Sequence, residues 1–119
     1  MSFPTSRRPV ERFSGSATSV TTSTITTISD VPASGFIVRI HAVKTSGDAA
    51  TVAPILSEDS AVSASVSQIA EATAAAHVDE VPVAPIPYSA TDNKLYLKHV
   101  PDTGTNNAVS YAIDIWPSG

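Results

Sequence analysis

The sequence predicts an all-β domain, an antiparallel β-sandwich of jelly-roll-like arrangement that carries an extended N-terminal arm. Three observations lead to this prediction. Short segments rich in β-branched residues alternate apolar and polar side chains with a period of two. Turns rich in Gly, Pro, Asn and Asp separate about six to eight such segments. The chain of 119 residues is long enough for one domain with its own core.

The first sixteen residues differ from the rest of the chain in charge and in backbone chemistry. They hold three arginines and one glutamate, a net charge of +2, whereas residues 17–119 hold four basic and ten acidic side chains, a net charge of −6. Pro4 and Pro9 favour extended backbone, so a helix is not expected there. We therefore expect an extended basic arm over residues 1–16 and a single β-sandwich domain over residues 17–119. The arm residues expected to bind a partner, phenylalanines as apolar anchors and arginines as partners for carboxylates, are Phe3, Arg7, Arg8, Arg12 and Phe13.

The first strands follow from local composition and alternation. Residues 14–29 contain eleven Ser or Thr together with several β-branched side chains, which favours an edge or a bulged strand. In residues 35–46, the even-numbered positions from Phe36 to Ala42 are expected on one face and the odd-numbered positions from Ile37 to Val43 on the other. A turn at residues 46–48 is expected to close a hairpin into a strand over residues 50–57.

The second half of the chain contains further expected strands. Residues 58–76 fit either a helical stripe or a strand, and we favour a loop followed by a strand over residues 66–73. Three prolines in residues 81–88 exclude a helix and favour extended chain. Strands are also expected over residues 94–100 and 108–116, on either side of a turn-rich loop. Their inward positions are Leu95, Leu97, Val109, Tyr111, Ile113 and Ile115.

The sequence contains no signature of catalysis. The absence of cysteine excludes disulfides, thiolate metal sites and cysteine nucleophiles. No P-loop, dinucleotide-binding fingerprint or nucleophile elbow occurs. His41, His77 and His99 lack the spacing of zinc ligands, and His41 and His99 are expected on outer strand faces. Residues 77–80 could instead form a weak metal-binding or general-base cluster. Residues 102–107 could hold calcium, although a turn is the favoured interpretation. We expect no enzyme activity, no cofactor and no metal ion.

Composition also restricts the partners. The acidic body argues against nucleic acid, and no segment is long and apolar enough to span a membrane. The N-terminus lacks the apolar run of a signal peptide, so we expect a soluble, intracellular product. Charged residues make up only 15% of the chain, against about 25% in typical domains, which suits a protein packed against neighbours. Candidate surface aromatic contacts, which could stack on a carbohydrate, are Tyr88, Tyr96 and Trp116.

The layout of the chain resembles a family of virion proteins. It joins the arm MSFPTSRRPVERF to strands such as FIVRIHAV, KLYLKHV and AVSYAIDIW through SGD and PDTGTNN turns. This layout resembles small decoration (cement) proteins and related β-sandwich accessory proteins of tailed-phage capsids. The resemblance implies a virion structural protein that binds the outside of the shell and stabilises contacts between major capsid subunits. It also implies a homo-oligomer, with a trimer favoured, at the capsid surface of a virion assembled in the host cytoplasm.

Two alternatives stay open at this point. The first is a carbohydrate-binding head-fibre or lectin-like module, which would use the three surface aromatic residues. The second is a tail or neck component of the virion, which would share the sandwich but assemble as a hexamer or a dodecamer.

Overall fold

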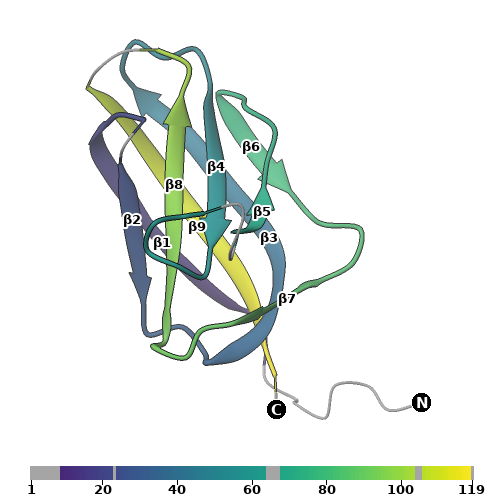
Figure 1. Cartoon of the computed structure of the whole chain (residues 1–119). Coiled ribbons are helices and arrows are strands. Elements are labelled where there is room, and N and C mark those ends of the chain that lie inside the picture. Colours follow the sequence, from purple (N-terminus) through teal and green to yellow (C-terminus); the bar gives the residue numbers. More distant parts are fainter. Residues whose placement is uncertain (1–8, 23, 64–67, 104–105, 119) are drawn as a thin grey trace.

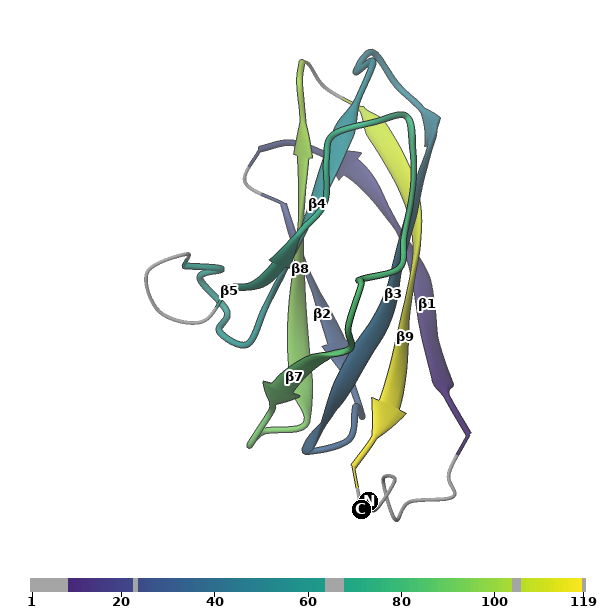
Figure 2. The ribbon, with the colours of Figure 1, turned by 90° about the vertical axis from the view of Figure 1, so that its right-hand side faces the viewer.

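The protein is a two-layered β-sandwich. The computed structural model describes residues 9–22, 24–63, 68–103 and 106–118, and these ranges contain nine strands in two antiparallel sheets that pack face to face (Figure 1). A view turned by 90° shows the two layers side by side (Figure 2). The prediction of an all-β antiparallel sandwich is confirmed, whereas the jelly-roll arrangement stays a prediction.

Each sheet has a defined strand order. Sheet A has the order β1–β9–β3–β6, and β7 pairs with another part of β3. Its strands are β1 (Glu11–Val20), β9 (Asn107–Pro117), β3 (Ser34–Ser46), β6 (His77–Glu80) and β7 (Ile86–Ser89). Sheet B has the order β2–β8–β4–β5. Its strands are β2 (Ile25–Ser29), β8 (Lys94–Pro101), β4 (Val52–Ser57) and β5 (Gln68–Glu71).

The core lies between the two sheets. Leu95 and Leu97 of β8 face Ile113 and Ile115 of β9, and all four are fully buried, as the alternation predicts. A second, smaller apolar cluster fills the other end of the sandwich and includes Val20, Ala42, Val52, Val78 and Val109. The two clusters hold the sheets together along their length.

The Ser/Thr-rich segment forms edges in both sheets. β1 lies at the edge of sheet A, and β2 lies at the edge of sheet B. The register of β1 with β9 is irregular between Ala17 and Val20, so the strand is also bulged. The prediction of an edge or bulged strand is therefore confirmed, with two strands in place of one.

β1 begins within the segment assigned to the arm. Residues 11–17 pair one by one with residues 115–109 of β9, and Phe13 packs against the main core cluster. The predicted boundary between residues 16 and 17 thus falls inside a strand. The reason is tertiary: the edge of β9 supplies a hydrogen-bonding partner that local composition does not reveal. Phe3, Arg7 and Arg8 lie outside the described residues.

A bulge in β3 changes the faces of its side chains. Ile37 and Arg39 pair with consecutive residues of β9, so Val38 has no counterpart there. One extra residue reverses the alternation, and Ile37 and Ile40 are both buried. The predicted division into one even-numbered and one odd-numbered face is therefore wrong at the start of the strand, because Phe36 lies half-buried on the outer face whereas Ile40 faces the core.

The predicted hairpin after β3 is also wrong. β3 belongs to sheet A and β4 to sheet B, so the chain crosses between the layers after Ser46. Gly47 has a φ of +111°, a conformation that favours glycine. An added Cβ there would also collide with Asn107, so the turn packs tightly against the start of β9. A local turn signal predicts a reversal of the chain but not the sheet that the next strand joins.

Candidate interaction surface

Four charged side chains alternate in sign across the outer face of sheet A. In the order of the strands they are Arg12 of β1, Asp114 of β9, Arg39 of β3 and Asp79 of β6. Neighbouring strands lie about 4.8 Å apart, so four adjacent strands span roughly 15 Å. We call these four residues the charge ladder.

The first pair of the ladder joins the first strand to the last. Arg12 Nε and Nη2 donate to the two carboxylate oxygens of Asp114, at 2.8 and 3.0 Å. The Asp114 side chain is 12% exposed, whereas Arg12 is 53% exposed. These hydrogen bonds and the attraction of Asp114 raise the pKa of the Arg12 guanidinium. The pair fixes the beginning of β1 against the body.

The second pair joins β3 to β6. Arg39 Nε and Nη2 donate to the two carboxylate oxygens of Asp79, at 2.6 and 2.8 Å. The hydrogen bonds from Arg39 lower the pKa of the Asp79 carboxyl, so this group stays ionised. Both side chains are more than a third exposed, so solvent screens the pair and its contribution to stability is small.

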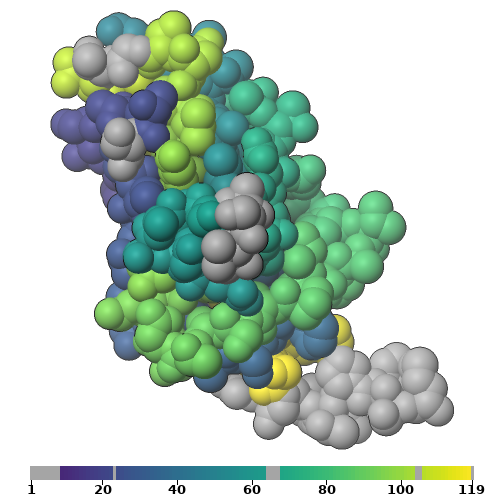
Figure 3. All heavy atoms as spheres, viewed as in Figure 1, coloured from purple at the N-terminus to yellow at the C-terminus, as the bar shows by residue number. Residues whose placement is uncertain are grey.

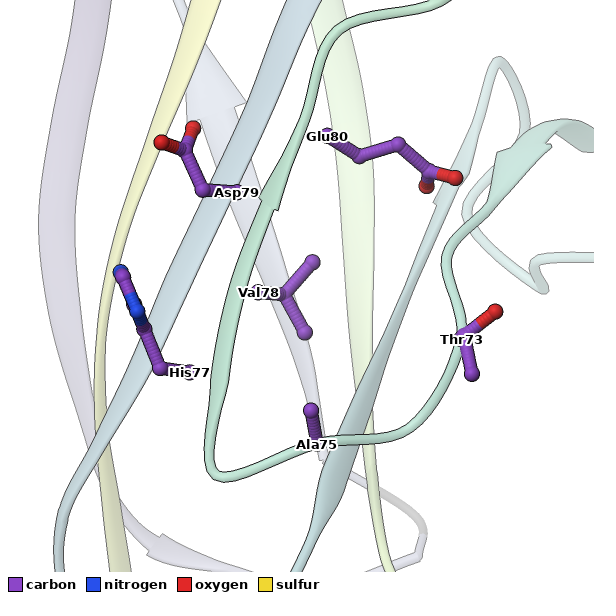
Figure 4. A pocket seen from close by; sticks show the side chains of 6 residues that line it. All are labelled: Thr73, Ala75, His77, Val78, Asp79 and Glu80. Carbon is purple, nitrogen blue, oxygen red and sulfur yellow. The ribbon is translucent and has the colours of Figure 1, made fainter.

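Two histidines lie next to the second pair. The rings of His41 and His77 meet edge to face with their centroids 5.1 Å apart, and His41 Nδ1 is 3.8 Å from Asp79 Oδ1. Along β6, His77 and Asp79 point to one side of the strand and Glu80 to the other (Figure 4). The predicted alternative of a metal or general-base cluster over residues 77–80 is therefore split between two faces. Among the described residues, no group of three or more His, Cys, Asp or Glu is arranged to hold a metal ion.

An aromatic pair lies on the same outer face. Phe36 of β3 and Trp116 of β9 are opposite each other in register, with ring centroids 6.3 Å apart and planes tilted by 51°. Both are half-buried. The alternation along β9 locates Trp116 opposite the core, as expected. The position of Phe36 on this outer face was not predicted, because nothing local in the sequence marks the bulge at Val38.

The three aromatic residues proposed to contact a carbohydrate do not form one platform. Tyr88 is 5% exposed, and its hydroxyl donates to the carbonyl of Pro32 at 2.8 Å. Burial raises its pKa to about 12. The prediction of Tyr88 at the surface is wrong, because its ring packs over Gly35 on the neighbouring strand. Tyr96 is half-buried in sheet B and donates to Asp92, whereas Trp116 belongs to sheet A.

His99 is buried, contrary to its expected position on an outer face. It has no exposed surface, and its Nε2 lies 3.2 Å from Thr26 Oγ1. Burial lowers the pKa of its imidazole to about 4. The sequence does indicate this burial, since His99 follows Leu95 and Leu97 at alternate positions along β8 and therefore points to the same face.

The polar side chains considered for a calcium loop support a turn instead. Asn107 Oδ1 accepts a hydrogen bond from the Ala49 amide at 2.9 Å, and Asp102 Oδ1 accepts one from the Ala50 amide at 3.0 Å. These oxygens satisfy the backbone of the β3–β4 connection. Residues 104 and 105 of the loop lie outside the described ranges.

A pocket of about 250 Å³ lies beside β6. Its walls come from the β5–β6 connection and from β6 itself (Figure 4), and its lining residues are Thr73, Ala75, His77, Val78, Asp79 and Glu80. Small-molecule sites usually enclose roughly 300–1,000 Å³. This pocket is smaller. Its two lining carboxylates, Asp79 and Glu80, point to opposite sides of β6 because side chains alternate along a strand.

Comparison with known proteins adds no relative. The sequence matches no protein-family model, no curated protein and no solved structure. The part of the chain that the structure describes contains no helix long and apolar enough to cross a membrane.

Proposed function

We propose that this protein is a decoration protein of a tailed-phage capsid, which binds the outside of the shell and stabilises contacts between major capsid subunits. One observation carries the proposal: the strand that continues the basic arm is anchored firmly to the body. Arg12 is held by two hydrogen bonds to Asp114, and Phe13 packs against the core. When the arm is bound to a neighbouring surface, β1 therefore transmits that attachment to the whole sandwich.

The arm residues divide into two roles. Arg12 and Phe13 make contacts within the sandwich and serve the junction. Phe3, Arg7 and Arg8 precede the described residues, and we assign to them the contacts with the shell. A buried phenylalanine contributes roughly 1.5–3 kcal/mol, and arginines pair well with carboxylates. Many copies on one shell multiply such modest contributions.

The outer face of sheet A supports the same proposal. Its four ladder charges are already paired within the chain, which reduces the penalty of covering them with another protein. Phe36 and Trp116 beside the ladder are residue types enriched in protein interfaces. We therefore infer that the arm and this face contact the shell together.

No observation favours the carbohydrate-binding alternative, because Tyr88 is buried. A tail or neck component would use the same arm and face, so the number of copies per particle separates it from a decoration protein. A component of the neck would be present in six or twelve copies, whereas a shell protein follows the number of capsomers.

The test is the rebinding of purified protein to particles of the phage that encodes it, after these have been stripped of the protein. The full chain, a variant lacking residues 1–8 and the variant Lys94→Ala are each incubated with particles and sedimented, and the bound copies are counted per particle. We expect the truncated variant to keep the unfolding midpoint of the full chain and to lose binding. Lys94→Ala, which removes an exposed positive charge from β8 of sheet B, outside both the arm and the proposed contact face, should retain most of it. Full binding by the truncated variant, or six or twelve copies per particle, would contradict the proposal.

A further inference from the structure

His99 of β8 is a buried titratable group that the proposed function does not use. It has no exposed surface, and its Nδ1 is buried with no hydrogen-bond partner among the described residues. In the neutral ring the proton can lie on Nε2, which is 3.2 Å from Thr26 Oγ1 of β2. Protonation would add a donor at Nδ1 with no acceptor in reach, and a buried charge without a partner is costly. The ring therefore has to reach water before it takes up a proton.

Among the residues that the structure describes, none with a charge faces this ring from the strands packed against it. Tyr111 of β9 is the facing titratable side chain, with the two ring centroids 5.8 Å apart. Burial raises the pKa of its hydroxyl, so Tyr111 is neutral in acid. β2 contributes the Thr26 hydroxyl, and Pro54 of β4 lies opposite His99 in register. No carboxylate is therefore placed to stabilise a charged imidazole in the closed sandwich.

β2 is the strand whose separation uncovers the ring most easily. β8 lies between β2 and β4 in sheet B, and β4 is itself covered by β5, whereas β2 is at the edge of the sheet. β2 lies at the surface along one side of the molecule (Figures 1 and 3). One of its five residues is buried, against four of the six residues of β4. The facing strand β9 lies between β1 and β3 in sheet A. Segments with few buried contacts open locally at the lowest free energy, so β2 should open first.

We propose that the fold contains an acid-sensitive switch, in which His99 is the sensor and β2 separates from β8 before the rest of the sandwich unfolds. The separation breaks the contact between His99 and Thr26 and uncovers Ile28, which is buried in the main core cluster. Above about pH 6.5 an exposed imidazole is neutral, so the closed state is favoured. At lower pH the proton on the exposed ring holds β2 open. This inference does not depend on the proposed function.

The first test is amide hydrogen exchange of the full chain at about pH 7 and about pH 5, in urea concentrations below the unfolding transition. A histidine with a pKa of about 4 when buried and about 6.5 when exposed favours the open state roughly 20-fold between these conditions. The protection of the β2 amides, corrected for the intrinsic effect of pH, should therefore fall roughly 20-fold. Their exchange should depend weakly on urea, whereas exchange at Ile113 and Ile115 should show the steep dependence of global unfolding. Unchanged protection of β2, or one urea dependence for both strands, would overturn the proposal.

Two variants identify the sensor. His99→Leu fills the site with a side chain that does not titrate, so the protection of β2 should no longer differ between the two pH values. Thr26→Val removes the contact to Nε2 but keeps the imidazole. It should lower the protection of β2 at both pH values and retain the change between them. A change of the same size in His99→Leu would assign the sensor to another group and contradict the proposal.

The second test locks β2 to β8 and keeps His99 in place. Ile25 and Lys98 are opposite each other in register, and the chain has no cysteine that could compete for a disulfide. In the oxidised double variant Ile25→Cys/Lys98→Cys, the midpoint of the His99 ring titration, followed by NMR, should move to lower pH. The reduced form of the same protein is the matched control and should titrate as the natural chain does. The same midpoint in the oxidised and reduced forms would show that the ring reaches water by another route, and would refute the role of β2.

Discussion

Arg12 and Asp114 are separated by 102 residues in the sequence, yet two hydrogen bonds of 2.8 and 3.0 Å join them across the first and last strands. The pair is asymmetric in its exposure to solvent. Asp114 is almost buried, whereas half of the Arg12 side chain is exposed. This asymmetry predicts which of the two residues is more costly to lose.

Arg12→Ala should destabilise the fold more than Asp114→Asn does. Removal of the arginine leaves a nearly buried carboxylate without its bidentate partner, whereas Arg12 can be solvated when Asp114 is neutralised. Urea unfolding of both single variants and the double variant measures the difference and the coupling energy. If the two single variants lost equal free energies of unfolding, the environment of Asp114 would compensate for the missing guanidinium.

Gly15→Ala should lower the free energy of unfolding by about 1–3 kcal/mol, the usual cost of overpacking. An added Cβ would lie 2.6 Å from Tyr111 Oη, and Tyr111 is packed in the core. Tyr111→Phe removes the nearest atom and should recover part of the loss when combined with Gly15→Ala. Ser16→Ala is the exposed control and should be nearly neutral. If Gly15→Ala were equally neutral, residues 11–16 would behave as a free arm and not as part of β1.

Asn107→Ala should cost about 2–3 kcal/mol of stability, because buried polar groups lose their partners. Its side chain is fully buried, accepts from the Ala49 amide at 2.9 Å and donates to the Thr103 carbonyl at 3.1 Å. Asp102→Ala should cost less, since its hydrogen bonds to the amides of residues 50 and 51 are exposed. Thermal unfolding of the two variants checks the order, which would be reversed if the loop owed its shape to Asp102.

Stability should fall as the pH decreases from about 6.5 to about 4. The folded state holds the pKa of His99 at about 4, whereas an unfolded histidine has a pKa of about 6.5. The unfolded state therefore binds more protons in this window, and the full loss is about 3 kcal/mol. Asp79 also has a lowered pKa, but its contribution is lost only below its unfolded value of 3.8. Urea unfolding across this range should show a flatter profile for His99→Leu, and an unchanged slope would assign the dependence to another group.

Much of the fold could be predicted from residue alternation alone. Leu95, Leu97, Ile113 and Ile115 were all expected in the core and are fully buried. The same rule, applied consistently, also predicts the burial of His99, which shares the parity of its leucine neighbours. The expected outer position of His99 is wrong because the position of a residue in the strand, and not the polarity of its side chain, determines which face it joins.

The candidate surface was harder to predict, because it depends on long-range pairing. Asp79 and Arg39 are 40 residues apart, and their contact exists because β6 pairs with β3. Phe36 faces outward because one extra residue at Val38 shifts the register against β9. No local pattern encodes either event.

The sequence by itself determined the class of the fold, most strand positions and the charge contrast between the first sixteen residues and the rest, since these follow from local composition and a period of two. The tertiary structure alone decided where β1 begins, which sheet receives the strand after Gly47 and which side chains share the outer face of sheet A. The physical reason is that a strand edge binds whichever partner leaves its backbone groups hydrogen-bonded and its apolar face buried. That choice depends on the whole set of strands, so it appears only when the sandwich is assembled.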